Sequence, residues 1–293
     1  MRFRSRDENQ ELNDETRKDA GGSFVQLPNG VTHYELGGNE SGDSIVLIHG
    51  FSVPYFIYDP TFEFLTRSGF RVLRYDLFGR GFSDRPRARY NLDFFVTQLA
   101  DLLNALRISR PVGLIGLSMG GPIASAFILR HPEHVDKLVL IDPTGAKPIT
   151  LTPMLKVAKI PFVAESILGL VGSDRLVQSI ADDFFDPAFV EHFLSKYKVQ
   201  LQYEGFKRAI LSTIRSNMLG SFMDVYQGLG KMDKQVLLFW GQDDNTVPFE
   251  HSANLRAALP NAEFHVIENC GHIPHYEKPE VVNPLLLKFL RTA

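Results

Sequence analysis

The chain of 293 residues contains a single cysteine and a single tryptophan. One cysteine, Cys270, excludes an internal disulfide framework and any zinc or iron–sulfur site built from several cysteines. Basic side chains are not in excess either, since 31 lysines and arginines stand against 34 aspartates and glutamates, a formal net charge of −3. A chain of this charge has no general basic field to hold nucleic acid. We therefore expect no nucleic-acid partner.

The N-terminal region lacks the apolar stretch that a signal peptide requires. Residues 1–22 are dominated by charged and polar side chains, which predicts a solvated, disordered tail and, with the lone cysteine, a cytoplasmic protein. Residues 111–129 carry no charge and approach the length of a membrane span, but they include four glycines and two prolines. We expect a buried strand, a tight turn and a buried helix there, and no integral membrane segment.

Short apolar runs recur along the chain, each followed by a turn and a helical pattern. They are Ser44–Ile48, Phe70–Tyr75, Val112–Leu117, Leu138–Ile141, Val236–Trp240 and Glu263–Ile267. Continuous rather than alternating apolar strands indicate a sheet that is covered on both faces, as parallel sheets are. Residues 92–106 place their apolar side chains on one helical face, and residues 121–131 are apolar nearly all round. The sequence predicts an α/β fold with a mostly parallel sheet flanked by helices.

The alternation of strands and helices breaks between residues 143 and 231. This stretch has no convincing strand but has amphipathic pieces at 154–163, 189–199 and 206–218. A helical insertion between two strands of an α/β sheet predicts a cap over a core formed by residues 23–142 and 232–293. Its first part is rich in apolar side chains that either pack on the core or line an apolar pocket: Ile149, Leu151, Met154, Leu155, Val157, Ile160, Phe162, Val163, Ile167, Leu168 and Leu170. Arg208 and Arg215 could reach inward.

The strongest chemical signal is the G-x-S-x-G pattern at Gly116–Gly120, with sequence GLSMG, between a predicted buried strand and a predicted buried helix. A nucleophile on a sharp strand-to-helix turn projects clear of the sheet, and the flanking glycines avoid a backbone collision. Backbone N–H groups at the start of the helix can stabilise developing negative charge. Ser118 is therefore the candidate nucleophile.

A serine hydroxyl needs a base and an orienting carboxylate to become a good nucleophile. Two segments at the ends of late strands offer them. Residues 241–248 (GQDDNTVP) contain two neighbouring aspartates, and residues 269–272 (NCGH) end in a histidine. The order Ser, Asp, His along the chain is that of the α/β-hydrolases.

On these motifs the chain resembles the α/β-hydrolase superfamily from about Val31 to the C-terminus, and within it the serine esterase and lipase branch that includes monoacylglycerol lipases. The matching pieces are 49–51 (HGF), 76–83 (DLFGRGFS), 116–121, 241–248 and 271–272. The resemblance implies that Asp244 is the acid and His272 the base, with Asp142 as an alternative acid position. His275 is then a supporting or surface residue. It further implies an oxyanion hole made by the backbone N–H groups of Phe51 and Met119.

Other motifs carry less. Residues 79–84 (GRGFSD) begin like a dinucleotide fingerprint but have aspartate at the third glycine, so we expect no nucleotide cofactor. His131–His134 and His272–His275 each space two histidines by three residues with a proline between, and further ligands are missing, so we expect no metal. Cys270 is expected to be a buried structural thiol.

The combined expectation is a serine hydrolase that cleaves small-molecule carboxylic esters through an acyl-enzyme, without a cofactor. The alternative within the fold is a carbon–carbon bond hydrolase of ring-cleavage dienones, which uses the same triad but for which convincing polar cap residues are not found. A ligand receptor on the same scaffold is the alternative from another class. Haloalkane dehalogenases and epoxide hydrolases place aspartate where this chain has Ser118. The oligomeric state stays open.

Overall fold

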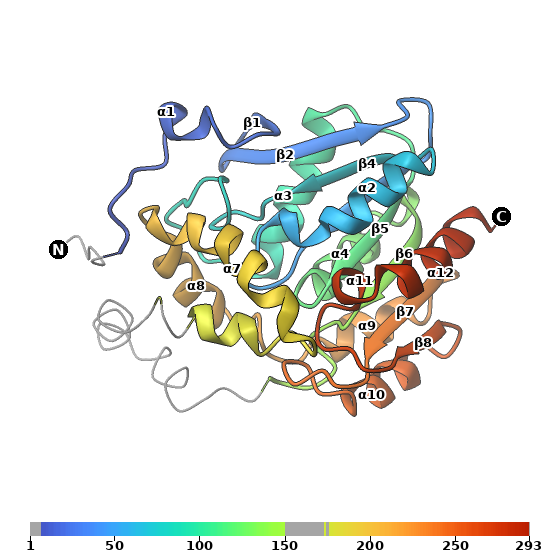
Figure 1. Cartoon of the computed structure of the whole chain (residues 1–293). Coiled ribbons are helices and arrows are strands. Elements are labelled where there is room, and N and C mark those ends of the chain that lie inside the picture. The colour runs from blue at the N-terminus through green and yellow to red at the C-terminus, as the bar shows by residue number, and fades with distance from the viewer. Residues whose placement is uncertain (1–6, 150–172, 174–175, 293) are drawn as a thin grey trace.

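A computed structural model describes residues 7–149, 173 and 176–292. Its centre is an eight-stranded sheet of order β1-β2-β4-β3-β5-β6-β7-β8 (Figure 1). The strands are β1 Ser23–Leu27, β2 Gly30–Gly38, β3 Ser44–Ile48, β4 Arg71–Tyr75, β5 Val112–Leu117, β6 Val135–Ile141, β7 Gln235–Gly241 and β8 Glu263–Ile267. Neighbouring strands are parallel across the part of the sheet that runs β4-β3-β5-β6-β7-β8, whereas β2 is antiparallel to both β1 and β4. The predicted mostly parallel α/β sheet is confirmed.

Helices cover both faces of the sheet because the central strands are apolar on both faces. Alternate residues of β3 belong to opposite cores. Val46 and Ile48 lie in the first core, on one face of the sheet, and Ile45 and Leu47 lie in the second core, on the other face. The first core includes α3 Leu92–Ala105, α4 Gly120–Arg130, α9 Met223–Leu229 and α10 His251–Ala258. The second includes α2 Asp59–Arg67, α7 Val190–Val199, α8 Phe206–Arg215 and α12 Pro279–Arg291. The short elements are α1 Asp14–Arg17, η1 Tyr55–Tyr58, η2 Pro132–His134, η3 Pro187–Phe189, η4 Gln200–Gln202 and α11 Pro274–Glu277.

The uncharged stretch 111–129 forms β5 and most of α4, as expected. None of the described helices combines the length and the hydropathy that crossing a membrane requires. The strand pair β1 and β2 was not anticipated from the sequence. Both strands are only partly buried, so they lack the continuous apolar runs that reveal the inner strands.

Between β6 and β7 the described chain is helical, with α7, η4, α8 and α9. Figure 1 shows α7 and α8 lying together at the end of the sheet toward which β4 points. The expected helical pieces at 189–199 and 206–218 correspond to α7 and α8. The piece at 154–163, and the expected apolar residues from Leu151 to Leu170, lie outside the described residues.

The expectation of a disordered tail is wrong for residues 7–22, which pack on the folded chain. Glu8 is buried, and its carboxylate accepts the backbone N–H groups of Gly205 (2.9 Å) and Lys207 (2.6 Å) at the start of α8. Arg17 is also buried, and it donates to Asp84 over 2.6 Å. Two of the charges that suggested a solvated tail, Glu8 and Arg17, are thus buried and partnered, and composition alone cannot show such pairing.

Candidate active site

Ser118 stands in the sharp turn between β5 and α4. Its φ of +53° lies in the left-handed region, which side chains other than glycine rarely occupy. The turn is held on both sides, since the Ser118 N–H donates to the Ile141 carbonyl (2.9 Å) and the Ser118 carbonyl accepts from Gly121 (2.9 Å) and Thr144 (3.1 Å). Neighbouring strand ends therefore fix the backbone that presents the hydroxyl.

The two glycines of the motif are required by close backbone approaches. A Cβ at Gly116 would lie 2.5 Å from the Gly120 carbonyl oxygen, and a Cβ at Gly120 would collide with the Ile48 carbonyl oxygen. The sequence pattern thus has the steric reason that the sequence analysis gave for it.

Asp244 and His272 meet although they follow different strands, β7 and β8. The His272 Nδ1 and the Asp244 Oδ2 are 2.7 Å apart, and both side chains are buried. The other carboxylate oxygen of Asp244 accepts the backbone N–H groups of Thr246 and Val247, each over 2.8 Å. Three hydrogen bonds thus fix the carboxylate and, through it, the orientation of the imidazole.

The charge on Asp244 also sets the basicity of His272. Burial on its own lowers the pKa of the imidazole, because it penalises the charged form. The negative charge of Asp244, its hydrogen bond and the more distant charge of Asp183 outweigh burial, so the pKa of His272 is raised above its ordinary value. The pair is arranged to stabilise an imidazolium.

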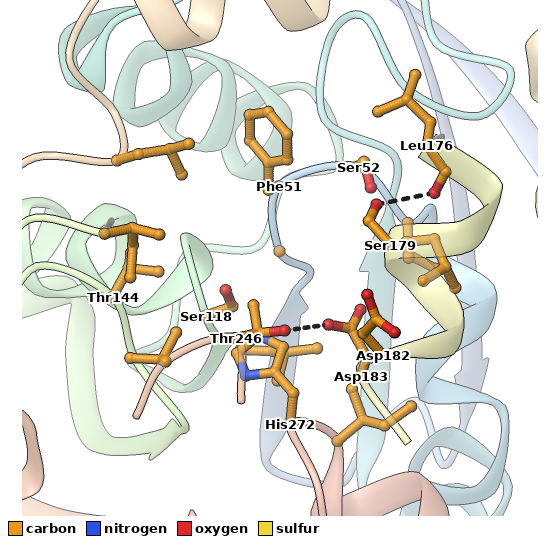
Figure 2. Close-up of a pocket in the computed structure, with 18 of the residues that line it drawn as sticks. Phe51, Ser52, Ser118, Thr144, Leu176, Ser179, Asp182, Asp183, Thr246 and His272 are labelled. Atoms are coloured by element: carbon orange, nitrogen blue, oxygen red, sulfur yellow. Dashed lines mark hydrogen bonds between the residues drawn. The ribbon is translucent and has the colours of Figure 1, made fainter. Parts of the chain in front are cut away.

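Ser118 and His272 line one cavity of about 350 Å³ (Figure 2). Within the described chain no hydrogen bond joins the Ser118 hydroxyl to the imidazole. Such bonds are often long or misaligned in ligand-free sites and tighten when substrate binds. The structure brings Ser118 and His272 to one cavity, with Asp244 bonded to the histidine.

Phe51 and Met119 lie beside Ser118. Phe51 lines the cavity, and Met119 is the residue from which α4 starts. In the part of the chain that the structure describes, neither backbone N–H donates to another protein group. The backbone around Phe51 is held from outside the cavity, because Arg80 donates to the Phe51 carbonyl (2.7 Å) and Gln200 to the Ser52 carbonyl (2.8 Å). Both N–H groups are therefore left without a protein acceptor among the described residues, as the donors of an oxyanion hole must be.

Asp142, the alternative acid position, does not contact the imidazole. It is fully buried, and its Oδ1 accepts the Gly241 N–H over 2.8 Å. Burial, and then the neighbouring charge of Asp244, raise the pKa of the Asp142 carboxyl well above its usual range. The geometry favours Asp244 as the partner of His272 and places Asp142 behind it.

Asp183 is a cavity residue that the sequence analysis missed. Its carboxylate accepts a 2.5 Å hydrogen bond from the Thr246 hydroxyl, and both residues line the cavity with Asp182 (Figure 2). Burial raises the pKa of Asp183 to about 6. Thr246 lies in the segment that supplies Asp244. Residues 182 and 183 precede α7 in the chain, and nothing in the sequence shows that this pair lies close to Thr246.

Glu277 is a second missed residue, and it joins two segments far apart in the sequence. Its carboxylate is buried and accepts three backbone N–H groups, from Phe185 (2.9 Å), Asp186 (2.9 Å) and Gly271 (2.8 Å). The His272 N–H in turn donates to the Asp183 carbonyl over 2.8 Å. The segment 183–186 and the loop that carries the histidine are therefore fastened to each other.

Three further candidates lie away from the cavity. His275 is fully buried against Tyr58, with ring centroids 4.9 Å apart, rather than at the surface. Cys270 is also buried, and burial raises the pKa of its thiol. Arg208 donates to the carbonyls of Arg85 (2.6 Å) and Pro86 (3.0 Å) instead of reaching inward.

Two groups of described side chains have ligand atoms close enough to hold a metal. One is His131, Glu133 and His134, and these atoms lie within 4.8 Å of one another near the surface. The other is Asp142, Asp244 and His272. In the second group the short Asp244–His272 contact already accounts for the geometry as a hydrogen bond.

Curated relatives align with nearly the whole chain. A 2-hydroxy-6-oxononadienedioate/2-hydroxy-6-oxononatrienedioate hydrolase from Cupriavidus pinatubonensis is 29% identical over 284 residues, which cover 91% of this chain and 94% of the relative. A 2-hydroxy-6-oxo-6-phenylhexa-2,4-dienoate hydrolase from Burkholderia cepacia is 28% identical, and the alignment covers 89% of this chain and 93% of the relative. A solved meta-cleavage product hydrolase from Pseudomonas fluorescens IP01 superposes with a TM-score of 0.77 at 24% identity, covering 92% of this chain and 97% of that one.

These names correct the functional expectation. The sequence led us to expect a carboxylic ester hydrolase acting on small-molecule esters. That expectation is wrong, because the curated relatives that align over about nine tenths of both chains are named as hydrolases of 2-hydroxy-6-oxo-dienoates. The motifs could not separate the two, since both chemistries call for the same nucleophile, base and acid.

The family model for the alpha/beta hydrolase fold matches residues 43–279. This range contains the turn at Ser118, both segments that bring Asp244 and His272 together, and the helices between β6 and β7. The chain is a hydrolase that belongs to the α/β-hydrolase fold family.

Proposed function

We propose that this chain hydrolyses a carbon–carbon bond in 2-hydroxy-6-oxo-dienoates, with Ser118, His272 and Asp244 as the catalytic triad. The observation that carries the proposal is the alignment with dienoate hydrolases over nine tenths of both chains. The cavity supports it, because it holds a serine on a strained turn and a histidine fixed by a buried carboxylate. Helices between residues 143 and 231 form the cap over this site.

The bond to be broken joins C5 to the carbonyl carbon C6. Its electron pair can leave on C5 only if C5 is conjugated to an electron sink. Moving the proton of the 2-hydroxyl to C5 provides one, because the resulting C2 ketone accepts the pair through the C3–C4 double bond. We assign this proton transfer to His272, the base that lines the cavity.

Ser118 then attacks C6 while His272 takes the hydroxyl proton. Asp244 holds the ring and stabilises the imidazolium, in agreement with the raised pKa of His272. The C6 oxygen becomes an oxyanion, and we assign its stabilisation to the N–H groups of Phe51 and Met119, which have no protein acceptor among the described residues.

Cleavage of the C5–C6 bond returns the electron pair through the conjugated chain to the C2 oxygen. The proton held by His272 then passes to the C2 oxygen and restores the hydroxyl of 2-hydroxypentadienoate, and the C6 fragment stays on Ser118 as an ester. His272 next takes a proton from water while the hydroxide attacks the ester. The ester bond then breaks, His272 returns the proton to the Ser118 oxygen, and a carboxylic acid leaves. Each step uses groups of this chain and water alone.

Turnover of 2-hydroxy-6-oxo-6-phenylhexa-2,4-dienoate tests the proposal. Loss of the dienoate absorbance must be matched by equal amounts of benzoate and 2-hydroxypentadienoate. We expect Ser118→Ala to lower kcat by about 10⁴-fold or more while the thermal unfolding curve stays close to that of the parent. A folded protein that releases no carboxylic acid from this or a related dienoate would overturn it, and tight binding without turnover would instead indicate a ligand receptor.

A further inference from the structure

We infer that the cavity selects dienoates whose C6 substituent is an apolar aryl or alkyl group, over dienedioates in which the C6 chain ends in a second carboxylate. This inference rests on the proposed function and names the substrate class within it. The relatives pose the choice, since one is named for a dienedioate and another for a 6-phenyl dienoate. Their identities of 29% and 28% do not decide between the two.

The first argument is the apolar lining of the cavity. Besides Phe51, the described lining includes aliphatic side chains from the core and from the helices between β6 and β7. They are Val53, Ile57, Leu117, Ile149, Leu176, Ile180, Ile210, Ile214, Leu219, Val247 and Ile273. Burying a phenyl or alkyl group against these side chains is favourable, whereas burying a carboxylate there requires its desolvation.

The second argument is the sign of the charge on the lining. Asp182 and Asp183 both contribute to the cavity, and in Figure 2 they lie on the same side of it as His272. Among the described lining residues His272 is the one that can become positively charged, and its Nδ1 already faces Asp244 at 2.7 Å. Both kinds of substrate bring the C1 carboxylate of the dienoate to this cavity, so the lining discriminates through the second carboxylate of a dienedioate, which adds a further anion to a cavity lined by Asp182 and Asp183.

The Asp183 carboxylate is built into this wall. Of the described residues Thr246 alone donates a hydrogen bond to its side chain, and the backbone of Asp183 is held in place by the His272 N–H. A carboxylate with one neutral donor keeps its charge uncompensated, so it repels a nearby anion more than a paired carboxylate would.

This charge makes the selectivity depend on pH. With a pKa of about 6, Asp183 is charged above that pH and neutral below it. The groups whose charges act on it are His272, Asp244 and Asp182. We expect the preference against a dienedioate to be fully present at pH 8 and to weaken as pH falls through 6.

The test compares kcat/KM for two substrates, 2-hydroxy-6-oxo-6-phenylhexa-2,4-dienoate and 2-hydroxy-6-oxononadienedioate. At pH 8 we expect kcat/KM for the phenyl substrate to exceed that for the dienedioate by about tenfold or more. Asp183→Asn should narrow this ratio about three- to tenfold, mainly by raising kcat/KM for the dienedioate. Asp182→Asn should narrow it in the same direction. Asp243→Asn, the same change at an exposed position outside the cavity, should leave it unaltered.

Binding to Ser118→Ala separates this inference from the proposed function. The preference must also appear as a lower Kd for the phenyl substrate when turnover is abolished. If neither compound is hydrolysed by the parent but the phenyl compound binds more tightly, the proposed function fails and the preference stands. Equal or better use of the dienedioate, or a ratio that Asp183→Asn and Asp182→Asn leave unchanged, would overturn the preference itself.

Discussion

The strand ends of the sheet and the segment from residue 176 to 186 meet in one cavity, but they are fixed in different ways. Ser118, Asp244 and His272 each follow a parallel strand, and neighbouring strand ends and turns hold the first two through backbone N–H groups. The segment 176–186 depends on two buried contacts with the histidine loop, one to the Asp183 carbonyl and one to the Glu277 carboxylate. The first arrangement holds the proposed triad, and the second brings side chains of residues 176–183 to the cavity.

The largest effect is expected from Asp244→Asn, which tests the residues that follow the strand ends of the sheet. The amide keeps the size of the side chain but removes the charge that orients and stabilises the imidazolium, so we expect kcat to fall by about 10³- to 10⁴-fold. In the parent, kcat/KM should rise with pH through an apparent pKa above the ordinary value for histidine, since His272 acts as a base when neutral. In the variant burial dominates, and this limb should move to lower pH.

Asp243→Asn is the matched control for this experiment, because the neighbouring aspartate is exposed and lies outside the cavity. Steady-state kinetics from pH 5 to 9 on both variants make the comparison. A variant at position 244 with activity within a few-fold of the parent would show that another group orients the imidazole, such as Asp142, whose carboxylate lies within 4.8 Å of it.

Glu277→Gln tests whether the cap segment and the histidine loop form one unit. A neutral amide cannot accept all three N–H groups, and its own NH₂ must face at least one of them, so we expect a loss of about 2–3 kcal/mol in the free energy of unfolding. Because the loop carries His272, kcat should fall together with stability. Denaturant titration measures the loss, with the exposed Glu268→Gln as the control.

If Glu277→Gln lowered stability while kcat and the substrate ratio stayed at their parental values, the contact would be structural only. The segment 176–186 and the loop that carries His272 would then be independent of each other.

The smallest effect should come from Glu8→Ala, at the far end of the cap. This carboxylate accepts the N–H groups of Gly205 and Lys207 at the positive end of the α8 dipole. Removing it should cost about 1 kcal/mol of stability by thermal or chemical unfolding. Glu11→Ala, an exposed change on the same segment, should cost much less, and equal losses for the two would argue against a specific cap.

The parts of the fold that could be predicted from the sequence are those that local patterns encode. Six runs marked the parallel strands β3 to β8, and GLSMG marked the turn because glycine alone tolerates the approaches at Gly116 and Gly120. The hairpin β1–β2 escaped because polar side chains interrupt its half-buried strands and no helical pattern separates them. The segment 7–22 was misread because charge density does not reveal that Glu8 and Arg17 find buried partners.

The candidate catalytic residues could be predicted from the sequence, whereas the substrate class could not. A shared set of motifs placed Ser118, Asp244 and His272, but it could not tell ester from carbon–carbon bond hydrolysis, because both reactions attack a carbonyl carbon. Asp183 and Glu277 carry no motif, since their positions matter only through contacts with Thr246 and with the N–H groups of a distant segment.

The sequence by itself determined the parallel strands of the sheet, the nucleophile turn and the set of groups able to perform acyl transfer, because each depends on residues close together or on repeated spacing. Tertiary structure alone decided which cap carboxylates line the cavity and how the N-terminal segment is held. Those outcomes depend on pairs such as Asp183 with Thr246, 63 positions apart, whose meeting is fixed by how the whole chain packs.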